Sequence, residues 1–563
     1  MSRYTKHMQL LEKINNIDED YSEISEDESS FQTDSEQCAT DDFTSESDKE
    51  EDVMISKRRG KKRIRLLLSS ESEDEVKDQG MRTAPDGTVW EEMDEITRNS
   101  KAAVHNIFRE LSGPTGYAKR HVMKGNVRSA FTLIIDRRIM EQIRACTEAE
   151  AFRVLGTKWE LSTEKLNAFI AVLYARGAYQ VNNIDVSLLW NKIWGPKFFP
   201  KTMSRNVFTE IMRFVRFDKK TDRSERLKSN KFALISDVWD RFIENSQNCY
   251  KPGAYITVDE QLFPTKARCR FTQYIPNKPD KFGIKFWFAS DVHSKYVING
   301  FPYLGKDDKR DNSTPLAEFV VLKLMEPFTG CGRNVTTDNF FTSLSLATRL
   351  LAKRTTIVGT IRANKREMPK FAKQKKDNMP RYSSKIYKSK QMSLTVYKSK
   401  PNKKVLLLSS MHSSIKIESS NKRLPETVSF YNNTKFGVDM TDQMARKYSV
   451  KSKSCRWPFQ VFSNILDLAA INAWVLYKET TGENISRQDF LFQLAVELAD
   501  TNEEAIRKPP SLKITGLQVR KTCQVRYCKD NKTEKICSIC DNYTCGKCTF
   551  ENTIICKKCG GNK

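Results

Sequence analysis

The 563-residue sequence has no long apolar run, and even AFIAVLYA (168–175) is too short to span a bilayer. Its opening residues, MSRYTKHMQLLEKI, lack the apolar core of a secretory signal. We therefore expect no membrane partner and a reducing compartment, where clustered cysteines more often bind metal than form disulfides. Histidine is also scarce, and none of the five (positions 7, 105, 121, 293 and 412) lies in the cysteine-rich C-terminal segment.

The N-terminal region is poor in aromatic residues and rich in Ser, Asp and Glu, as in SEISEDESSFQTDSEQ. Residues 1–80 hold 12 Lys and Arg against 22 Asp and Glu, a net charge of −10. Because the whole chain has a net charge of +25, residues 81–563 carry +35. Such a composition cannot bury enough apolar surface to fold, which predicts disorder over residues 1–104. The basic cluster KRRGKKRIR (57–65) predicts nuclear import, and the basic remainder predicts a polyanionic partner such as DNA.

In the rest of the chain, the spacing of apolar residues changes several times. Apolar residues at helical spacing mark residues 105–250 and again 457–500, as in KLNAFIAVLYARGAY and NILDLAAINAWVLYKET. The predicted segments are a disordered acidic region, a helical domain in two parts, a catalytic core in two parts around an insertion, and a Cys-rich domain. The acidic region covers 1–104 and the Cys-rich domain 520–563. The helical domain covers 105–250 and 457–519. The catalytic core covers 251–366 and 426–456, and the insertion between its two parts covers 367–425.

The core predicts an α/β fold from its order of elements. Strands are expected at 254–262, 283–291, 295–305, 333–341 and 355–362, and helices at 314–328 and 343–354. This order of three strands, helix, strand, helix, strand matches a ribonuclease-H-like core, in which the first and fourth strands lie side by side. Asp259 and Asp338 would then meet where those strands end.

Residues 367–425 interrupt this core with 15 Lys and Arg against only 3 Asp and Glu. The segments QMSLTVYKSK and KKVLLLSSM indicate strands, so we expect a basic, β-rich insertion. FGVDMTDQM (436–444) would follow as the last helix of the core, with Asp439 and Asp442 three residues apart on one face.

Three carboxylates on rigid elements suffice to hold two divalent ions for phosphodiester cleavage, and oxygen ligands suit Mg²⁺ or Mn²⁺. Asp259, Asp338 and Asp439 are the predicted ligands. Asp442 is a further catalytic candidate that either binds metal directly or supports a residue that does. Each aspartate alone would more often be a capping or solvated residue, and the agreement with the topology favours catalysis.

Two groups of residues are candidates for DNA contact. Arg362, Lys365 and Arg366 follow a predicted strand out of the core, where they could hold phosphates near the metals. The second group comprises a basic stretch and a tryptophan for stacking on an unpaired base: Lys447, Lys451, Lys453, Arg456 and Trp457. A solvated strand exit and a buried core tryptophan are the alternatives.

Eight of the 14 cysteines fall in the final 41 residues: Cys523, Cys528, Cys537, Cys540, Cys545, Cys548, Cys556 and Cys559. CxxC spacing presents two thiolates to one tetrahedral Zn²⁺, and so short a segment needs metal to stabilise its fold. We expect two zinc ions. From the residues alone, RING-like protein binding, as in a ubiquitin ligase, is an admissible function for this module.

Several long motifs together resemble the piggyBac-type transposases. They are TVDEQL, YIPNKPDKFGIKFWF, KYVINGFPYLG, TTDNFFTS, IVGTIRANKRE, YNNTKFGVDMTDQM and SCRWPF, and the resemblance runs from about residue 105 onward. It implies a cut-and-paste DNA transposase with a catalytic triad of Asp259, Asp338 and Asp439. It further implies a dimer that acts on transposon end repeats, passes through hairpin ends and joins at TTAA. The alternative is a domesticated nuclear DNA-binding protein that no longer moves DNA.

The resemblance also implies a cross-brace arrangement of the cysteines, with a domain that binds repeat DNA. Pairs one and three would share one zinc (Cys523, Cys528, Cys545 and Cys548), and pairs two and four the other (Cys537, Cys540, Cys556 and Cys559). Members of the family commonly have a His among these ligands, and Cys548 takes its place here.

Overall fold

The computed structural model describes residues 81–93, 107–276, 280–305, 314–374, 378–401 and 403–507, and in the C-terminal segment 521–525, 528, 531–537, 542–549 and 555–557. The chain divides into two compact units, residues 1–503 and 504–563. The predicted nuclear import cluster at 57–65 lies outside the described residues.

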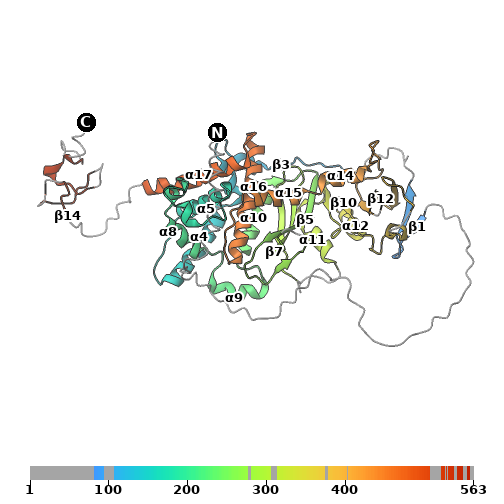
Figure 1. The fold of residues 1–563 in the computed structure, drawn as a ribbon, viewed down its shortest axis with the longest axis horizontal. Helices are drawn as coiled ribbons and strands as arrows, with labels where there is room; N and C mark the ends of the chain where they lie inside the picture. Colours follow the sequence, from blue (N-terminus) through green and yellow to red (C-terminus); the bar gives the residue numbers. More distant parts are fainter. Residues whose placement is uncertain are drawn as a thin grey trace, which may run out of the picture. The chain divides into compact units, whose positions relative to one another are not determined.

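The first unit is built on a mixed sheet of eleven strands in the order β1-β2-β11-β12-β13-β10-β9-β5-β7-β6, with β8 paired to β7 (Figure 1). Its strands are β1 (Met81–Thr83), β2 (Val89–Met93), β5 (Tyr255–Pro264), β6 (Thr272–Tyr274), β7 (Phe282–Asp291), β8 (Val297–Pro302), β9 (Asn334–Thr337), β10 (Thr356–Thr360), β11 (Ser384–Ser389), β12 (Met392–Lys400) and β13 (Lys403–Ser409). Among these described strands, β5, β9 and β10, at the centre, are the ones that pair in parallel.

The strand and helix order predicted for the core is confirmed. β5, β7, β8, α11 (Leu316–Met325), β9, α12 (Leu344–Ala352) and β10 occur in the expected order, with the short strand β6 added between β5 and β7, and β5 lies beside β9. One detail differs, because Asp259 does not end its strand. β5 runs on to Pro264, since β7 pairs with it from Ile256 to Pro264, whereas β9 stops at Thr337.

The two helical stretches of the sequence pack together at one end of this unit (Figure 1). α16 contacts α2, α3 and α10, so segments more than 200 residues apart share one core. The helices are α2 (Gly116–His121), α3 (Val127–Ile134), α4 (Arg137–Leu155), α5 (Thr163–Ala178), α6 (Val186–Leu189), α7 (Phe198–Thr202), α8 (Arg205–Phe214), α9 (Lys220–Ser229), α10 (Ser236–Cys249), α16 (Trp457–Thr481) and α17 (Arg487–Arg507). The short strands β3 (Gly113–Pro114) and β4 (Tyr250–Lys251) close this part.

α16 is long and apolar enough to cross a membrane by length and composition, and no other helix among the described residues is. However, 94% of its apolar window is buried inside the protein. A helix that is apolar all round and enclosed by other helices is the core helix of a globular domain.

The insertion is β-rich, as predicted, and its strands β11, β12 and β13 extend the central sheet through β10. α13 (Lys370–Lys373) lies within this segment, and α14 (Glu426–Thr434) and α15 (Gly437–Lys447) follow it. α14 contacts β5, β10 and β13, and α15 contacts β5 and β7, so both return the chain to the middle of the sheet.

The prediction of disorder is wrong for residues 81–93, which form the hairpin β1–β2 at the edge of the sheet. β2 pairs with β11, and Trp90 is fully buried with its indole Nε1 donating to the Glu367 carbonyl at 2.9 Å. A single buried tryptophan and a strand pairing across almost 300 residues hold a segment whose local composition does not favour folding.

Candidate active site

Three of the four predicted catalytic aspartates line a single cavity of about 230 Å³ at the centre of the sheet. Asp259 comes from the middle of β5, Asp338 directly follows β9, and Asp439 lies in the first turn of α15. Asp259 and Asp338 are partly buried, and Asp439 is exposed. Three segments separated by about 80 and 100 residues thus bring their carboxylates to one place.

Strand register explains why Asp259 and Asp338 are neighbours. β5 and β9 run parallel, and their last paired residues are Val258 and Thr337. The next residue after each is an aspartate, Asp259 on β5 and Asp338 after β9. Because β9 ends there, the edge of β5 is open at this point. Asp338 then accepts from the backbone N–H of Phe340 at 2.9 Å, which fixes its carboxylate in the turn that follows the strand.

Gly437 determines how closely α15 approaches β5. A Cβ at this position would lie 2.4 Å from Thr257 Oγ1 and 2.8 Å from Thr257 Cβ, which is too close for any side chain. Thr257 cannot easily turn away, because its hydroxyl donates to the Thr434 carbonyl at 2.6 Å. The glycine therefore allows the start of α15, and with it Asp439, to pack directly over the strand that carries Asp259.

The cavity concentrates negative charge. Burial raises the pKa of the Asp259 carboxyl well above its ordinary value, and the charges of Glu260, Asp338 and Asp439 raise it further. Burial is also the largest cause of the raised pKa of Asp338, to which Glu260 adds, while backbone N–H donors and the Arg362 guanidinium oppose the rise. Carboxylates held together in this way favour a bound cation.

Asp442, the fourth candidate, does not line this cavity. Its Oδ1 accepts from Gln261 Nε2 at 2.8 Å, and its Oδ2 accepts from Arg446 Nε at 3.0 Å. Gln261 in turn accepts from Asn464 Nδ2 of α16 at 2.8 Å, and Arg446 also donates to the Leu262 carbonyl. The structure thus gives Asp442 contacts that join β5, α15 and α16; a direct role in catalysis stays a prediction.

Besides residues of β5 and β9, the cavity is lined by Tyr431, Lys435 and Phe436, to which the sequence assigned no role. Burial raises the pKa of the Tyr431 phenol. Lys435 places its ammonium 4.7 Å from the centroid of the Phe436 ring and 5.4 Å from that of Tyr431. All three lie in YNNTKF, the first part of the motif YNNTKFGVDMTDQM, so that motif and their nearness in sequence to Asp439 were the available signals.

Of the first group of predicted DNA contacts, Arg362 lies beside the site. Its Nε donates to Asn339 Oδ1 at 3.2 Å, one residue after Asp338, and the side chain is exposed. Arg366 is exposed and Lys365 is half-buried on the segment that leaves β10. Their contact with DNA stays a prediction.

The second group does not form one surface. Lys447 and Lys453 are exposed, whereas the ammonium of Lys451 lies 5.5 Å from the ring centroid of Phe263, and burial lowers its pKa. Trp457 stacks on Phe232 with ring centroids 5.8 Å apart and contacts Phe271 edge-on. Those aromatic neighbours give Trp457 a packing role; base stacking by it stays a prediction.

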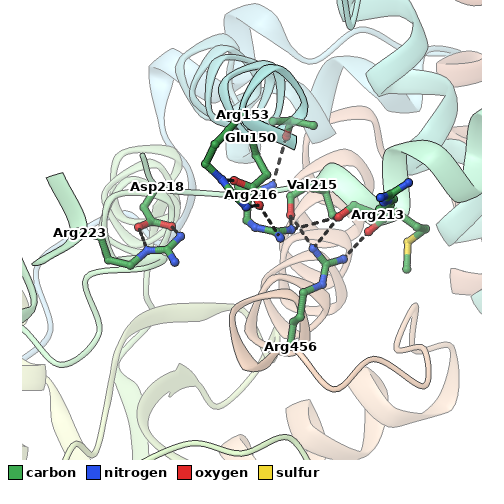
Figure 2. A network of polar contacts seen from close by, with 10 residues as sticks. Glu150, Arg153, Arg213, Val215, Arg216, Asp218, Arg223 and Arg456 are labelled. Atoms are coloured by element: carbon green, nitrogen blue, oxygen red, sulfur yellow. Dashed lines mark hydrogen bonds and ion pairs between the residues drawn. The ribbon is translucent and has the colours of Figure 1, made fainter. Parts of the chain in front are cut away.

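Arg456 is engaged in the interior (Figure 2). Its guanidinium donates to the Val215 carbonyl at 2.9 Å, which also accepts from Arg216 at 3.0 Å, while Arg216 pairs with Glu150 at 2.9 Å. Two guanidinium groups thus cap the carbonyl end of α8, where positive charge is favourable. Burial lowers the pKa of Arg456 to about 10. The residue ties the start of α16 to α8 and α4.

In the second unit, one of the two predicted cysteine groups is assembled. The sulfur atoms of Cys523, Cys528, Cys545 and Cys548 all lie within 4.8 Å of one another, which is the set predicted for pairs one and three. Four thiolates at this spacing match a tetrahedral zinc site. Of the other group, Cys556 N–H donates to Cys537 Sγ at 3.2 Å, and Cys540 and Cys559 lie outside the described residues.

Comparison with known proteins identifies the class to which this fold and site belong. The family described as Transposase IS4 matches residues 127–474, more than half of the chain, and the chain therefore belongs to this transposase family. Its piggyBac type, predicted from the motifs, is confirmed by the relatives described next.

Two human proteins are similar in sequence. PiggyBac transposable element-derived protein 3 is 22% identical over 355 residues, which is 59% of this chain and 57% of that protein. PiggyBac transposable element-derived protein 2 is 24% identical over 292 residues, which is 49% of this chain and 48% of that protein. The chain thus spans about half the length of the curated relatives that it matches.

A solved structure is similar along its full length. It is the cryo-EM structure of a piggyBac transposase synaptic complex with hairpin DNA, with a TM-score of 0.67 and 31% identity. The similarity covers 80% of this chain and 100% of that one.

Proposed function

We propose that this protein is a cut-and-paste DNA transposase in which Asp259, Asp338 and Asp439 bind two Mg²⁺ or Mn²⁺ ions. The observation that carries the proposal is the convergence of these three carboxylates on one cavity. The strand order β8-β7-β5-β9-β10, with β5, β9 and β10 parallel, supports a ribonuclease-H-like core beneath that cavity.

The residues present fit such metals. The donors are carboxylate oxygens, which hard divalent cations prefer, and the raised pKa of Asp259 reflects burial together with negative charge that is not neutralised. Two ions held there would supply an activated attacking oxygen and a stabilised leaving oxygen.

The chain's own cations would place the DNA. Lys435 lines the cavity, and Arg362 borders it beside Asn339, so both can receive phosphate oxygens next to the carboxylates. Tyr431 and Phe436 complete the wall and limit the entry of water. These roles orient the substrate, and the carboxylates would hold the ions on which the chemistry depends.

The wider activity follows from family membership. We infer excision through hairpin ends, integration at TTAA, action as a homodimer, a nuclear location, and a C-terminal module that binds two zinc ions and repeat DNA. The similar solved structure is itself a synaptic complex with hairpin DNA, and the cluster of four cysteines supports one of the two zinc ions.

The second candidate function is a transposase-derived DNA-binding protein that no longer moves DNA. It is favoured by the human relatives, which are named as transposable element-derived proteins. Excision from a donor plasmid that carries the matching transposon ends separates the two functions. Excision by the wild type that is lost in Asp338→Asn supports transposition, and end binding without excision by either protein supports the alternative.

Binding to DNA in either case should depend steeply on salt. The log of the binding constant should fall with the log of salt concentration by a slope of about −0.9 for each phosphate contacted. A binding constant that does not change with salt concentration would contradict DNA as the partner of the basic residues 81–563.

A further inference from the structure

Phe436 is an exposed aromatic residue at the cavity of the three aspartates. Its side chain is 48% exposed and forms part of the wall of the cavity that the three aspartates line. Single exposed hydrophobic residues are common on protein surfaces and carry no meaning by themselves. An aromatic ring beside a carboxylate cluster, in contrast, is positioned to meet whatever the carboxylates bind.

Local geometry fixes how the ring is presented. Phe436 is the residue that precedes α15, so it shares the first turn with Asp439, three residues on, and with Met440, four residues on. Met440 is also 40% exposed, which extends the apolar surface along the same side of the helix. The ammonium of Lys435 lies over the ring, 4.7 Å from its centroid.

This arrangement combines the parts of a nucleobase site. An aromatic face stacks on any base, and a nearby cation receives the phosphate of the same nucleotide. The faces of a base inside a duplex are already stacked on its neighbours, so the ring can be used only by a base that has left the stack.

We propose that Phe436, with Met440 and Lys435, is a stacking platform for one unstacked nucleobase of the DNA strand whose phosphate lies at the Asp259–Asp338–Asp439 cavity. The inference rests on the proposed function, because the cavity must receive a DNA phosphate for a base to reach the ring. It adds a base-binding position, independent of the carboxylates, that favours frayed, single-stranded or distorted ends over intact duplex.

The test compares binding of two DNA molecules of one sequence, with Ca²⁺ in place of Mg²⁺ to prevent cleavage. One is a blunt duplex, and the other has a short single-stranded extension with 2-aminopurine as its first unpaired base. Phe436→Ala should weaken binding of the extended DNA roughly 5- to 150-fold, the loss of one base–aromatic stack, and weaken blunt-duplex binding far less. The wild type should quench 2-aminopurine fluorescence on binding, and Phe436→Ala should abolish that quenching.

Matched variants isolate stacking from bulk and from folding. Phe436→Trp should retain both tight binding and quenching, whereas Phe436→Leu, which keeps apolar volume without a π-face, should behave like the alanine variant. Phe152→Ala removes an aromatic side chain that is 60% exposed on α4, outside the cavity. This variant should bind both DNA molecules as the wild type does. Thermal unfolding of each variant checks that the fold is intact.

The outcomes separate this inference from the proposed function. If the wild type binds blunt duplex but Phe436→Ala binds the extended DNA as the wild type does, the platform is refuted and the proposed function stands. Equal losses on both DNA molecules would also refute it, because stacking on an unpaired base predicts a selective loss. If the wild type binds neither DNA, both proposals fail.

Discussion

Substituting Gly437 by alanine tests the geometry of the site most directly. The added Cβ would lie 2.4 Å from Thr257 Oγ1, whereas ordinary contacts of this kind begin at 3.4 Å, so α15 must move away from β5 by about 1 Å. Thr257 is held by its hydrogen bond to the Thr434 carbonyl, which leaves the helix as the element that yields.

The displacement has two expected costs. Overpacking of this size destabilises a fold by about 1–3 kcal/mol. Since Asp439 moves with the helix, a misplacement of about 1 Å should lower the rate of single-turnover DNA cleavage on the order of 100-fold. Unfolding in urea and cleavage of pre-bound DNA measure these costs separately, and Mn²⁺ binding followed by electron paramagnetic resonance reports on the site without requiring turnover.

Gly116→Ala is the matched control. Gly116 is also the first residue of a helix, α2, but a Cβ there would meet only Arg120 Nη1, at 4.0 Å. Alanine at this position should change neither stability nor cleavage. Wild-type cleavage and Mn²⁺ binding by Gly437→Ala would show that the close approach of α15 to β5 does not set the site.

Three further predictions concern other parts of the chain. Cys545→Ser should lower the zinc content from about two ions per chain to about one, measured by mass spectrometry, while Cys455→Ser, at an exposed free thiol, should change nothing. Burial raises the pKa of Asp467 from 3.8 to about 7, so the folded state binds its proton more tightly and stability falls as pH rises through this window, by up to ~4 kcal/mol; Asp467→Asn should flatten the pH dependence of urea unfolding. Asp442→Ala should weaken Mn²⁺ binding by about 10- to 100-fold without changing the number of bound ions, whereas Asp439→Ala should change that number.

Each of these has a contradicting result. Unchanged zinc in Cys545→Ser would remove the cluster of four cysteines from the metal assignment. Parallel pH profiles for Asp467→Asn and the wild type would show that Asp467 does not titrate in this window. Loss of one Mn²⁺ ion in Asp442→Ala would make Asp442 a ligand.

Strand and helix order in the core was predictable because its signals are local. Alternating and continuous apolar runs mark β5, β7 and β9, and the predicted order of strands and helices then places Asp259 beside Asp338. The hairpin at residues 81–93 was not predictable in this way. It forms because β2 pairs with β11, and neither the composition around Trp90 nor its spacing indicates so distant a partner.

The density of basic residues in the sequence was also a poor guide to which of them form a surface for DNA. The basic run after α15 indicated a surface for phosphate, yet its members have different environments: Lys453 is exposed, Lys451 lies beside Phe263, and Arg456 caps α8. A linear pattern gives the number of cations, and burial decides which of them can meet a ligand. Two guanidinium groups at the carbonyl end of one helix are a requirement of packing that the sequence does not display.

Asp439 and Asp442 also show that a sequence pattern does not determine the environment of each charged side chain. Three residues apart on a helix, they share a face, and the sequence predicted Asp439 as a metal ligand while leaving Asp442 as either a ligand or a supporting residue. In the fold that face is divided: Asp439 reaches the cavity over the open edge of β5, while Asp442 meets Gln261, two residues beyond Asp259 on the same side of the strand. Arg446 neutralises Asp442, whereas the charge around Asp259 is left for a cation to balance. One turn of helix therefore separates the predicted metal ligand Asp439 from Asp442, whose contacts join α15 to β5.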